Sequence, residues 1–113
     1  MPERSQFTSP EGRSPTPGPL AGLLVADLSR VLAGPYATQI LGDLGATVIK
    51  VESRDGDETR GWKPPHLEGV SAYYLGVNRN KRDVVFDFRS SEDRALAQEL
   101  TTRADIACSA RVR

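Results

Sequence analysis

The sequence predicts an α/β fold of Rossmann-like type, in which a mostly parallel sheet is flanked by helices. Residues 23–28 form a short apolar run, which is typical of a strand covered on both faces. A helical pattern follows, with Gly34-Pro35 at its start and Gly45 just after its end. Residues 47–51 are mostly β-branched, so the chain re-enters the sheet, and a right-handed crossover makes the two strands parallel.

The helix that begins near Pro35 carries apolar residues at helical spacing, and we expect this stripe to face the core. Its members are Ala37, Ile40, Leu41 and Leu44. Residues 53–69 read as a long polar loop, and loops of that length are usually functional or mobile. The further elements expected are, in chain order, a helical turn over 71–76, a strand over 84–88, a helix from Ser90 to about Arg103 and a strand over 105–108.

The composition argues against several classes of function. At 113 residues the chain has room for one domain, and residues 1–18, rich in Pro, Ser and Gly, are predicted to be a disordered leader. Because 15 Lys and Arg balance 15 Asp and Glu, neither nucleic acid nor a membrane is expected as a partner. With one cysteine, Cys108, and one histidine, His66, no disulfide and no metal site are expected, and the chain is predicted to be cytoplasmic.

The loop after the first strand is the first candidate for ligand binding. Parallel sheets bind ligands beyond the carboxyl ends of their strands, where residues 29–35 lie. Glu52 ends the second strand as in dinucleotide-binding folds, but the G-x-G-x-x-G motif of those folds is missing from the loop. A fragment of an NAD-binding dehydrogenase therefore stays an alternative only.

A basic cluster precedes the third expected strand. Arg79, Lys81 and Arg82 fall within four residues of one another. They could hold phosphate groups, or they could form a solvated loop, which is the more common role of such a cluster in a neutral protein.

Four blocks of the sequence occur in a characteristic order: VADLSRVLAGPYATQILGDLGATVIKVE, GDETRGW, YYLGVNRNKRDVVFDF and RADI. In these blocks the chain resembles the N-terminal part of the family III CoA-transferases, which include formyl-CoA transferase, carnitine CoA-transferase and the α-methylacyl-CoA racemases. The resemblance covers residues 19 to about 107. The RGW segment and the complete YYLGVNRNKR block are more similar to the transferases than to the racemases.

The resemblance implies an acyl-CoA:carboxylate CoA-transferase with a Rossmann-like fold. Its substrates would be an acyl-CoA and a carboxylic acid, with coenzyme A as part of the substrate and no prosthetic group or metal. An aspartate would attack the thioester and carry covalent intermediates. The subunits of the family form a homodimer of interlocked rings.

Carried over by position, the resemblance implies two groups of coenzyme A contacts. Val31, Leu32 and Ala33 match the contacts made by the first loop. The second group follows the third strand, where it packs on adenine and reaches a phosphate: Phe86, Asp87, Phe88 and Arg89. Arg89 is the expected cation, and core packing is the alternative role of Phe86. Ser53 stands where the family commonly has an arginine, and Arg54 is the expected substitute.

The resemblance stops near the end of the chain. After RADI the family continues into an E-N-F-x-P-G motif, whereas this chain has SARVR at 109–113. The nucleophilic aspartate of the family lies further downstream, so no catalytic residue is named. We therefore expect residues 19–113 to be a truncated, incomplete N-terminal portion of the family's large domain, which binds coenzyme A and is inactive alone. The alternatives are a non-enzymatic CoA-binding or subunit-interaction module and a racemase-type fragment.

Overall fold

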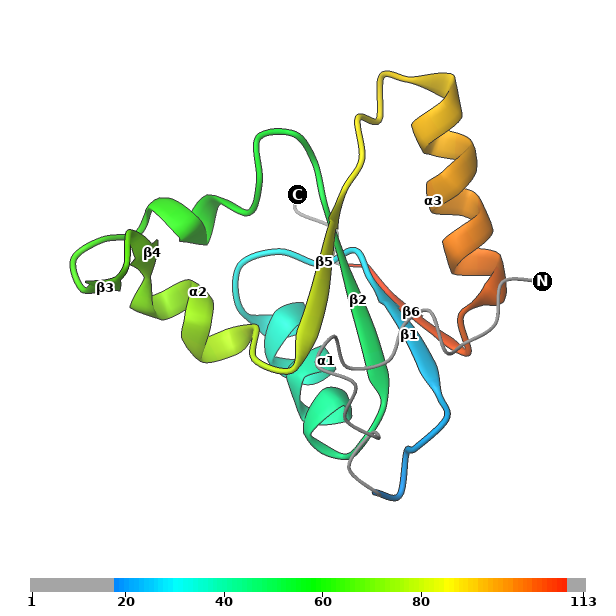
Figure 1. The fold of residues 1–113 in the computed structure, drawn as a ribbon, viewed down its shortest axis with the longest axis horizontal. Coiled ribbons are helices and arrows are strands. Elements are labelled where there is room, and N and C mark those ends of the chain that lie inside the picture. Colours follow the sequence, from blue (N-terminus) through cyan, green and yellow to red (C-terminus); the bar gives the residue numbers. More distant parts are fainter. Residues whose placement is uncertain (1–17, 110–113) are drawn as a thin grey trace.

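A four-stranded parallel sheet forms the centre of the molecule (Figure 1). The computed structural model describes residues 18–109. The strands lie in the order β5-β2-β1-β6, and their bounds are Leu24–Asp27 for β1, Thr47–Glu52 for β2, Lys81–Val85 for β5 and Ile106–Cys108 for β6. All three neighbouring pairs are parallel. The predicted α/β fold with a parallel sheet is confirmed.

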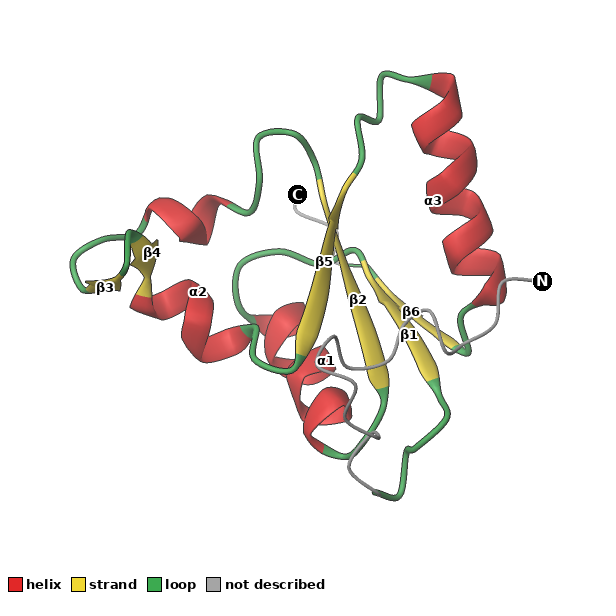
Figure 2. Cartoon of the chain, viewed as in Figure 1, coloured by secondary structure: helices red, strands yellow, loops and turns green. Residues whose placement is uncertain are grey.

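Two helices make the crossovers between these strands (Figure 2). Helix α1 (Ala33–Asp43) joins β1 to β2, and helix α3 (Ser91–Arg103) joins β5 to β6. They cover opposite faces of the sheet, because successive residues of a strand point to opposite sides. Leu24 belongs to the core cluster that contains Leu100 of α3, whereas Val25 belongs to the cluster against which Leu41 of α1 packs.

Strand β6 pairs with β1 at one edge of the open sheet, although the two strands are far apart in the sequence. Leu24 N–H donates to Asp105 Oδ2 at 2.8 Å, across 81 residues of chain. Asp105 N–H donates back to the carbonyl of Leu24, also at 2.8 Å. The first and last strands of the described chain are therefore direct neighbours.

The segment between β2 and β5 projects to one side of the sheet (Figure 1). It contains η2 (Glu58–Gly61), the short antiparallel pair β3 (His66–Leu67) and β4 (Val70–Ser71), and α2 (Ala72–Val77). The long loop predicted over 53–69 is thus partly structured. The Asp57 carboxylate caps η2 by accepting from Thr59 N–H, and Gly69, with φ of 84°, allows the turn between β3 and β4.

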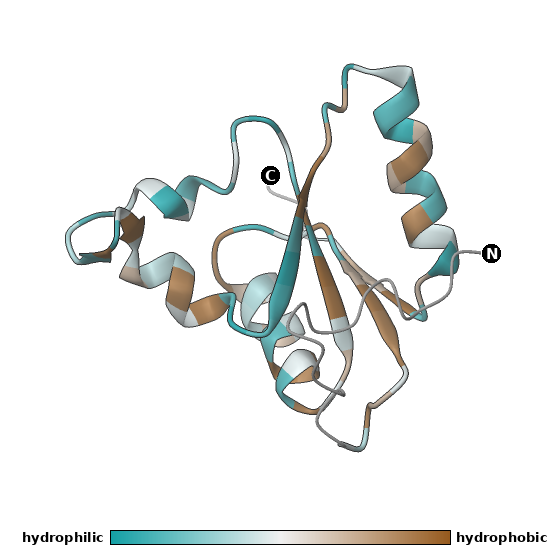
Figure 3. Cartoon of the chain, in the orientation of Figure 1, coloured by the Kyte–Doolittle hydropathy of each residue, from teal (hydrophilic) through white to brown (hydrophobic). Residues whose placement is uncertain are grey.

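The prediction for the buried face of α1 was wrong for three of its four residues, and of the four only Leu41 packs against the core. Ala37, Ile40 and Leu44 are exposed, and α1 instead buries Pro35, Thr38 and Gln39. The hydroxyl of Thr38 donates to the buried Asp27 carboxylate at 2.6 Å, and Gln39 Oε1 accepts from Arg79 N–H at 3.1 Å. Polar partners on distant elements therefore determine which side of the helix faces inward. The hydropathy colouring in Figure 3 shows apolar residues concentrated in the central strands.

The third strand begins and ends three residues earlier than predicted. Its first residue is Lys81, and its last, Val85, pairs with Glu52. Phe86, Asp87 and Phe88 follow the strand rather than belong to it. This places them in the loop that leaves the carboxyl end of β5.

Several sequence-based expectations concern residues that the structure does not describe. The predicted leader, apart from Gly18, and the last four residues lie outside the described range. Within residues 18–109, no helix is long and apolar enough to cross a membrane. Over the same residues, no group of three or more His, Cys, Asp or Glu is arranged to hold a metal ion.

Candidate functional site

Three loops leave the sheet at the same edge. Strands β1, β2 and β5 are parallel neighbours, so their carboxyl ends lie side by side. The loops that follow them begin at Leu28, Ser53 and Phe86 (Figure 2). Ligands of open α/β sheets bind beyond such an edge, and the residues assigned to coenzyme A by resemblance all lie in or next to these loops.

The loop after β1 is held in an unusual backbone conformation. Val31 has φ of +73°, in the left-handed region that β-branched residues rarely adopt. Strain of this kind costs about 1–3 kcal/mol and persists only where the surrounding structure enforces it. Behind the loop, Ser29 is fully buried, and both its N–H and its hydroxyl donate to the Asp27 carboxylate. The loop is therefore attached firmly to the end of β1.

Helix α1 begins directly after this strained residue. Leu32 is its N-cap, and no side chain accepts a hydrogen bond from the first N–H groups. Such groups attract anions, because they lack intrahelical partners and the helix dipole is positive there. Gly34 is required here, since a Cβ atom at this position would overlap the side chain of Ser29. Leu32 and Ala33 are exposed beside these groups.

The loop after β5 gathers two exposed cations around one carboxylate. Arg89 Nε lies 3.2 Å from Asp87 Oδ1, and Arg54 lies 3.7 Å from Asp87 Oδ2. The backbone N–H and then the guanidinium of Arg89 hold the pKa of Asp87 below its usual range. The side chains of Arg89 and Arg54 are 82% and 65% exposed, so both can reach an added anion.

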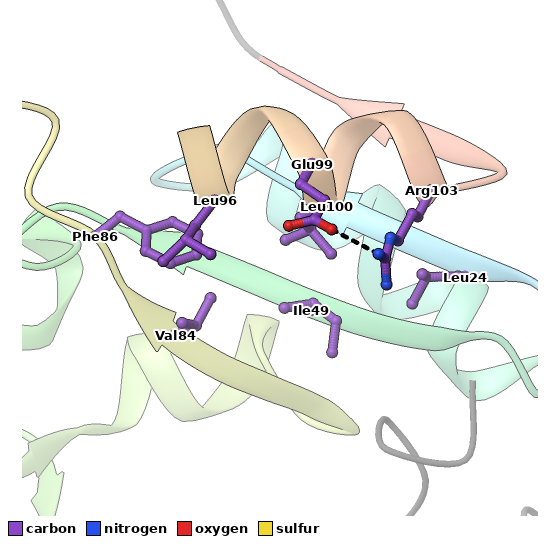
Figure 4. Close-up of a pocket in the computed structure, with 8 residues that line it drawn as sticks. All are labelled: Leu24, Ile49, Val84, Phe86, Leu96, Glu99, Leu100 and Arg103. Carbon is purple, nitrogen blue, oxygen red and sulfur yellow. Dashed lines mark hydrogen bonds and ion pairs between the residues drawn. The ribbon is translucent and has the colours of Figure 1, made fainter. Parts of the chain in front are cut away.

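The two phenylalanines of this loop lie in different environments. Phe86 is half-buried and packs against the core cluster of Leu24, Ile49 and Leu100. It also lines an apolar cavity of about 200 Å³ between α3 and the sheet (Figure 4). Core packing thus accounts for its present contacts, and its contact with adenine stays a prediction. Phe88 is 41% exposed.

A second charged cluster lies beside the same edge. Arg60 donates to Glu52 at 2.7 and 2.9 Å and to Asp83 at 2.8 Å, and it lies over the ring of Tyr74. Burial opposes the charge of Glu52, but the bonds from Arg60 and Asp83 outweigh it and lower its pKa to about 2. Burial and the neighbouring Glu52 raise the pKa of Asp83 to about 7.

Two lysines are buried behind the loops, and neither was predicted from the sequence to be buried. Lys50 pairs with Asp57 at 3.0 Å, and Lys81 pairs with Asp27 at 2.9 Å. All four side chains are at most 2% exposed. Of the basic cluster, Lys81 is therefore buried, whereas Arg79 is 62% exposed. A signal was present: Asp27 and Lys50 interrupt strands whose other residues predict burial on both faces.

Burial disfavours the charged form of both partners of the Asp27–Lys81 pair, and only for Asp27 do the hydrogen bonds outweigh this effect. Burial disfavours the charged form of Asp27, but the hydrogen bonds from Ser29, Thr38 and Lys81 outweigh it, so the pKa of Asp27 is lowered. Burial also lowers the pKa of Lys81, against the effect of its ion pair with Asp27. Asp27 is therefore held as a carboxylate whose oxygens are already occupied.

The structure groups the predicted site residues in two sets at one edge. Arg54, Asp87 and Arg89 form a single ion-paired cluster. Residues 31–33 form the loop and helix start after β1, two strands away from β5. Contact of either set with a ligand stays a prediction.

An exposed α1 N-terminus and exposed guanidinium groups, which follow different strands at the same carboxyl edge of a parallel sheet, define a class of α/β protein suited to a phosphate-bearing ligand. A family model described as CoA-transferase family III matches residues 20–112, and the chain belongs to this family. The resemblance drawn from the sequence is confirmed.

Relatives and solved structures agree with this assignment. The chain is 47% identical over 95 residues to "Succinate--glutarate CoA-transferase" of Agrobacterium fabrum, covering 78% of this chain and 24% of that protein. It is 48% identical over 89 residues to "Succinyl-CoA:glutarate CoA-transferase" of Homo sapiens, covering 78% and 20%. A CAIB/BAIF family protein from Brucella suis has a TM-score of 0.76 and 50% identity, covering 80% and 25%. The chain thus spans about a quarter or less of these proteins.

Proposed function

We propose that this chain is the coenzyme A-binding part of an acyl-CoA:carboxylate CoA-transferase. The observation that carries the proposal is the shared edge of the sheet. There the uncapped start of α1 and the cluster of Arg54, Asp87 and Arg89 present positive groups to one region. Relatives named as CoA-transferases of dicarboxylic acids support acyl-CoA and carboxylate substrates.

The chemistry of coenzyme A fits these groups. Its phosphates carry negative charge, which guanidinium groups bind through paired, charge-assisted hydrogen bonds. Arg89 is the cation best placed for this role, because its side chain is 82% exposed in the loop that leaves β5. Exposed Leu32 offers an apolar contact to the uncharged part of the ligand, and exposed Phe88 offers a ring face.

Three aspartates near this edge are already paired with cations, and we assign them structural and binding roles rather than that of a nucleophile. Asp27 and Asp57 are buried and paired with lysines, and Asp87 is paired with Arg89 and Arg54. A transfer reaction of this class needs a free carboxylate near the thioester. In our proposal that group comes from a further part of the enzyme, and the chain alone binds coenzyme A without transferring it.

A homodimer is part of the same proposal. Tyr36 and Ile40 of α1 and its C-cap Leu44 recur every four residues, and all three are between 41% and 54% exposed. An apolar stripe of this kind is typical of a surface that another protein segment covers. Sedimentation of the chain at several concentrations tests whether it self-associates.

Calorimetric titration with coenzyme A tests the binding proposal. We expect saturable binding that weakens about tenfold in Arg89→Ala, the loss of one charge-assisted contact. Arg79→Ala is the matched control: Arg79 is also exposed and paired with an aspartate, Asp43, but precedes β5 at the opposite edge. Its affinity should equal that of the wild type.

Each other outcome of the titration has a defined meaning. Equal affinity of Arg89→Ala and wild type would remove the phosphate contact from the proposal. No binding of coenzyme A by the wild-type chain would overturn the proposed function. Tighter binding of NAD than of coenzyme A would favour the dehydrogenase alternative.

A further inference from the structure

The ammonium group of Lys81 makes three hydrogen bonds, which is all that a lysine can donate. Its acceptors are Asp27 Oδ2, the carbonyl of Pro35 and Asn78 Oδ1, each at 2.9 Å. They belong to the end of β1, the first turn of α1 and the C-cap of α2. Lys81 itself starts β5, so one buried cation joins four elements.

Lys50 makes a similar connection from the adjacent strand. Its ammonium donates to Asp57 Oδ2 at 3.0 Å and to the carbonyl of Ser29 at 3.3 Å, and it lies 5.8 Å from the centre of the Tyr74 ring. Ser29 is in the loop after β1, and Asp57 is in the loop after β2. Lys50 thus links two loops of the candidate site from beneath.

Both lysines therefore contact the backbone of one segment, residues 28–35. Lys50 holds its second residue, Ser29, and Lys81 holds its last, Pro35. The strained Val31 lies between these two points. A strained conformation persists only where its surroundings enforce it, and the two carbonyl contacts act on either side of it.

Stability alone is a poor explanation for these pairs. Removing two charges from water is costly, and replacing a buried ion pair with uncharged residues is often neutral or stabilising. A buried ion pair is better suited to fixing one geometry, because each ammonium bond has a defined direction. The contacts with Ser29 and Pro35 indicate which geometry is fixed here.

We propose that Lys50 and Lys81 are positioning residues that hold residues 28–35 in the conformation that binds coenzyme A. This inference rests on the proposed function. Neither lysine touches the ligand, because both side chains are buried. When the binding conformation is only partly populated, the apparent Kd rises in inverse proportion to its population.

Two double variants remove the cations without leaving a buried unpaired carboxylate. Asp27→Asn/Lys81→Met keeps the side-chain oxygen that accepts from Ser29, and Lys50→Met/Asp57→Asn keeps the one that accepts from Thr59. The matched control is Glu99→Gln/Arg103→Gln, which removes a partly exposed ion pair of α3 that lies outside residues 28–35. Single Lys→Met variants are avoided because the remaining carboxylate would be buried without its partner.

The first readout needs no ligand. Hydrogen exchange of the free chain is measured at the amides of Ser29 and Tyr36, which donate to Asp27 and Leu32. We expect about tenfold faster exchange at these amides in both double variants, and unchanged exchange at the β2 amides. The second readout is coenzyme A titration, in which a fall of the binding conformation to about a tenth raises the apparent Kd about tenfold.

The two readouts separate failure of this inference from failure of the proposed function. Wild-type exchange rates and wild-type Kd values in both double variants would overturn the positioning role while leaving coenzyme A binding intact. Faster loop exchange with an unchanged Kd would also overturn it. If the wild-type chain binds no coenzyme A, the proposed function fails and this inference fails with it.

Discussion

Replacement of Gly34 by alanine is a direct test of how the loop after β1 is packed. The new Cβ would overlap Ser29, which is fully buried and cannot move without breaking its bonds to Asp27. Overpacking costs about 1–3 kcal/mol, and weakening a hydrogen bond to a charged group costs about 1.5–3 kcal/mol. The better helix propensity of alanine returns about 1 kcal/mol at most. We expect a net loss of about 2–4 kcal/mol in the free energy of unfolding.

The assay is thermal unfolding of the variant beside the wild type and a control. For a domain of this size, each kcal/mol lowers Tm by about 4–8 °C, so Gly34→Ala should unfold about 8–32 °C earlier. Gly76→Ala is the matched control, because Gly76 lies in α2 and a Cβ there meets no atom within 4 Å. Its Tm should be equal to or above that of the wild type. An equal Tm for Gly34→Ala would refute the close packing of Ser29.

Three further predictions address charge, capping and the core. Because the folded state raises the pKa of Asp83 to about 7 from 3.8, it binds more protons than the unfolded state in this range, and stability should fall from pH 4 to pH 7. Glu52, with its pKa lowered to about 2, should add a loss of stability as pH falls below about 4.5. Urea unfolding across pH checks both, and an Asp83→Asn variant that keeps the slope above pH 4 would contradict the first. Ser71→Ala should cost about 1–2 kcal/mol in urea, because the hydroxyl caps α2, and wild-type stability would exclude that cap. Leu100→Ala should cost about 2–5 kcal/mol in the same assay and the half-exposed Leu96→Ala much less, and equal losses would contradict the described packing of α3.

Much of the fold could be predicted from local sequence signals. Residues 23–52 specify a strand, a helix and a second strand through apolar runs, Gly34-Pro35 and Gly45, and the structure has these elements in this order. The family could be recognised because its motifs are continuous in sequence. Such local patterns predict secondary structure without reference to contacts between residues that are far apart in the sequence.

The remaining features depend on contacts between distant residues. Thr38 and Gln39 are buried because their partners, Asp27 and Arg79, lie on other elements, and helical spacing of apolar residues cannot reveal this. The early start of β5 has the same cause, since Lys81 is a strand residue whose charge is compensated by Asp27, 54 positions away. Within the candidate site, resemblance supplied residues that are predicted to contact coenzyme A, but not the buried lysines behind them.

The placement of β6 next to β1 has a consequence for synthesis of the chain. Strand β1 can pair with β2 as soon as both have left the ribosome. Its other side can pair only after β6 has been made, and Asp105, which precedes β6, is 81 positions after Leu24. At 5–20 residues per second, that delay is about 4–16 s. During this interval the newly made β1 has an open side, to which a chaperone or another nascent chain can bind. The order of the strands therefore leaves one side of β1 without its partner strand for the whole of this interval.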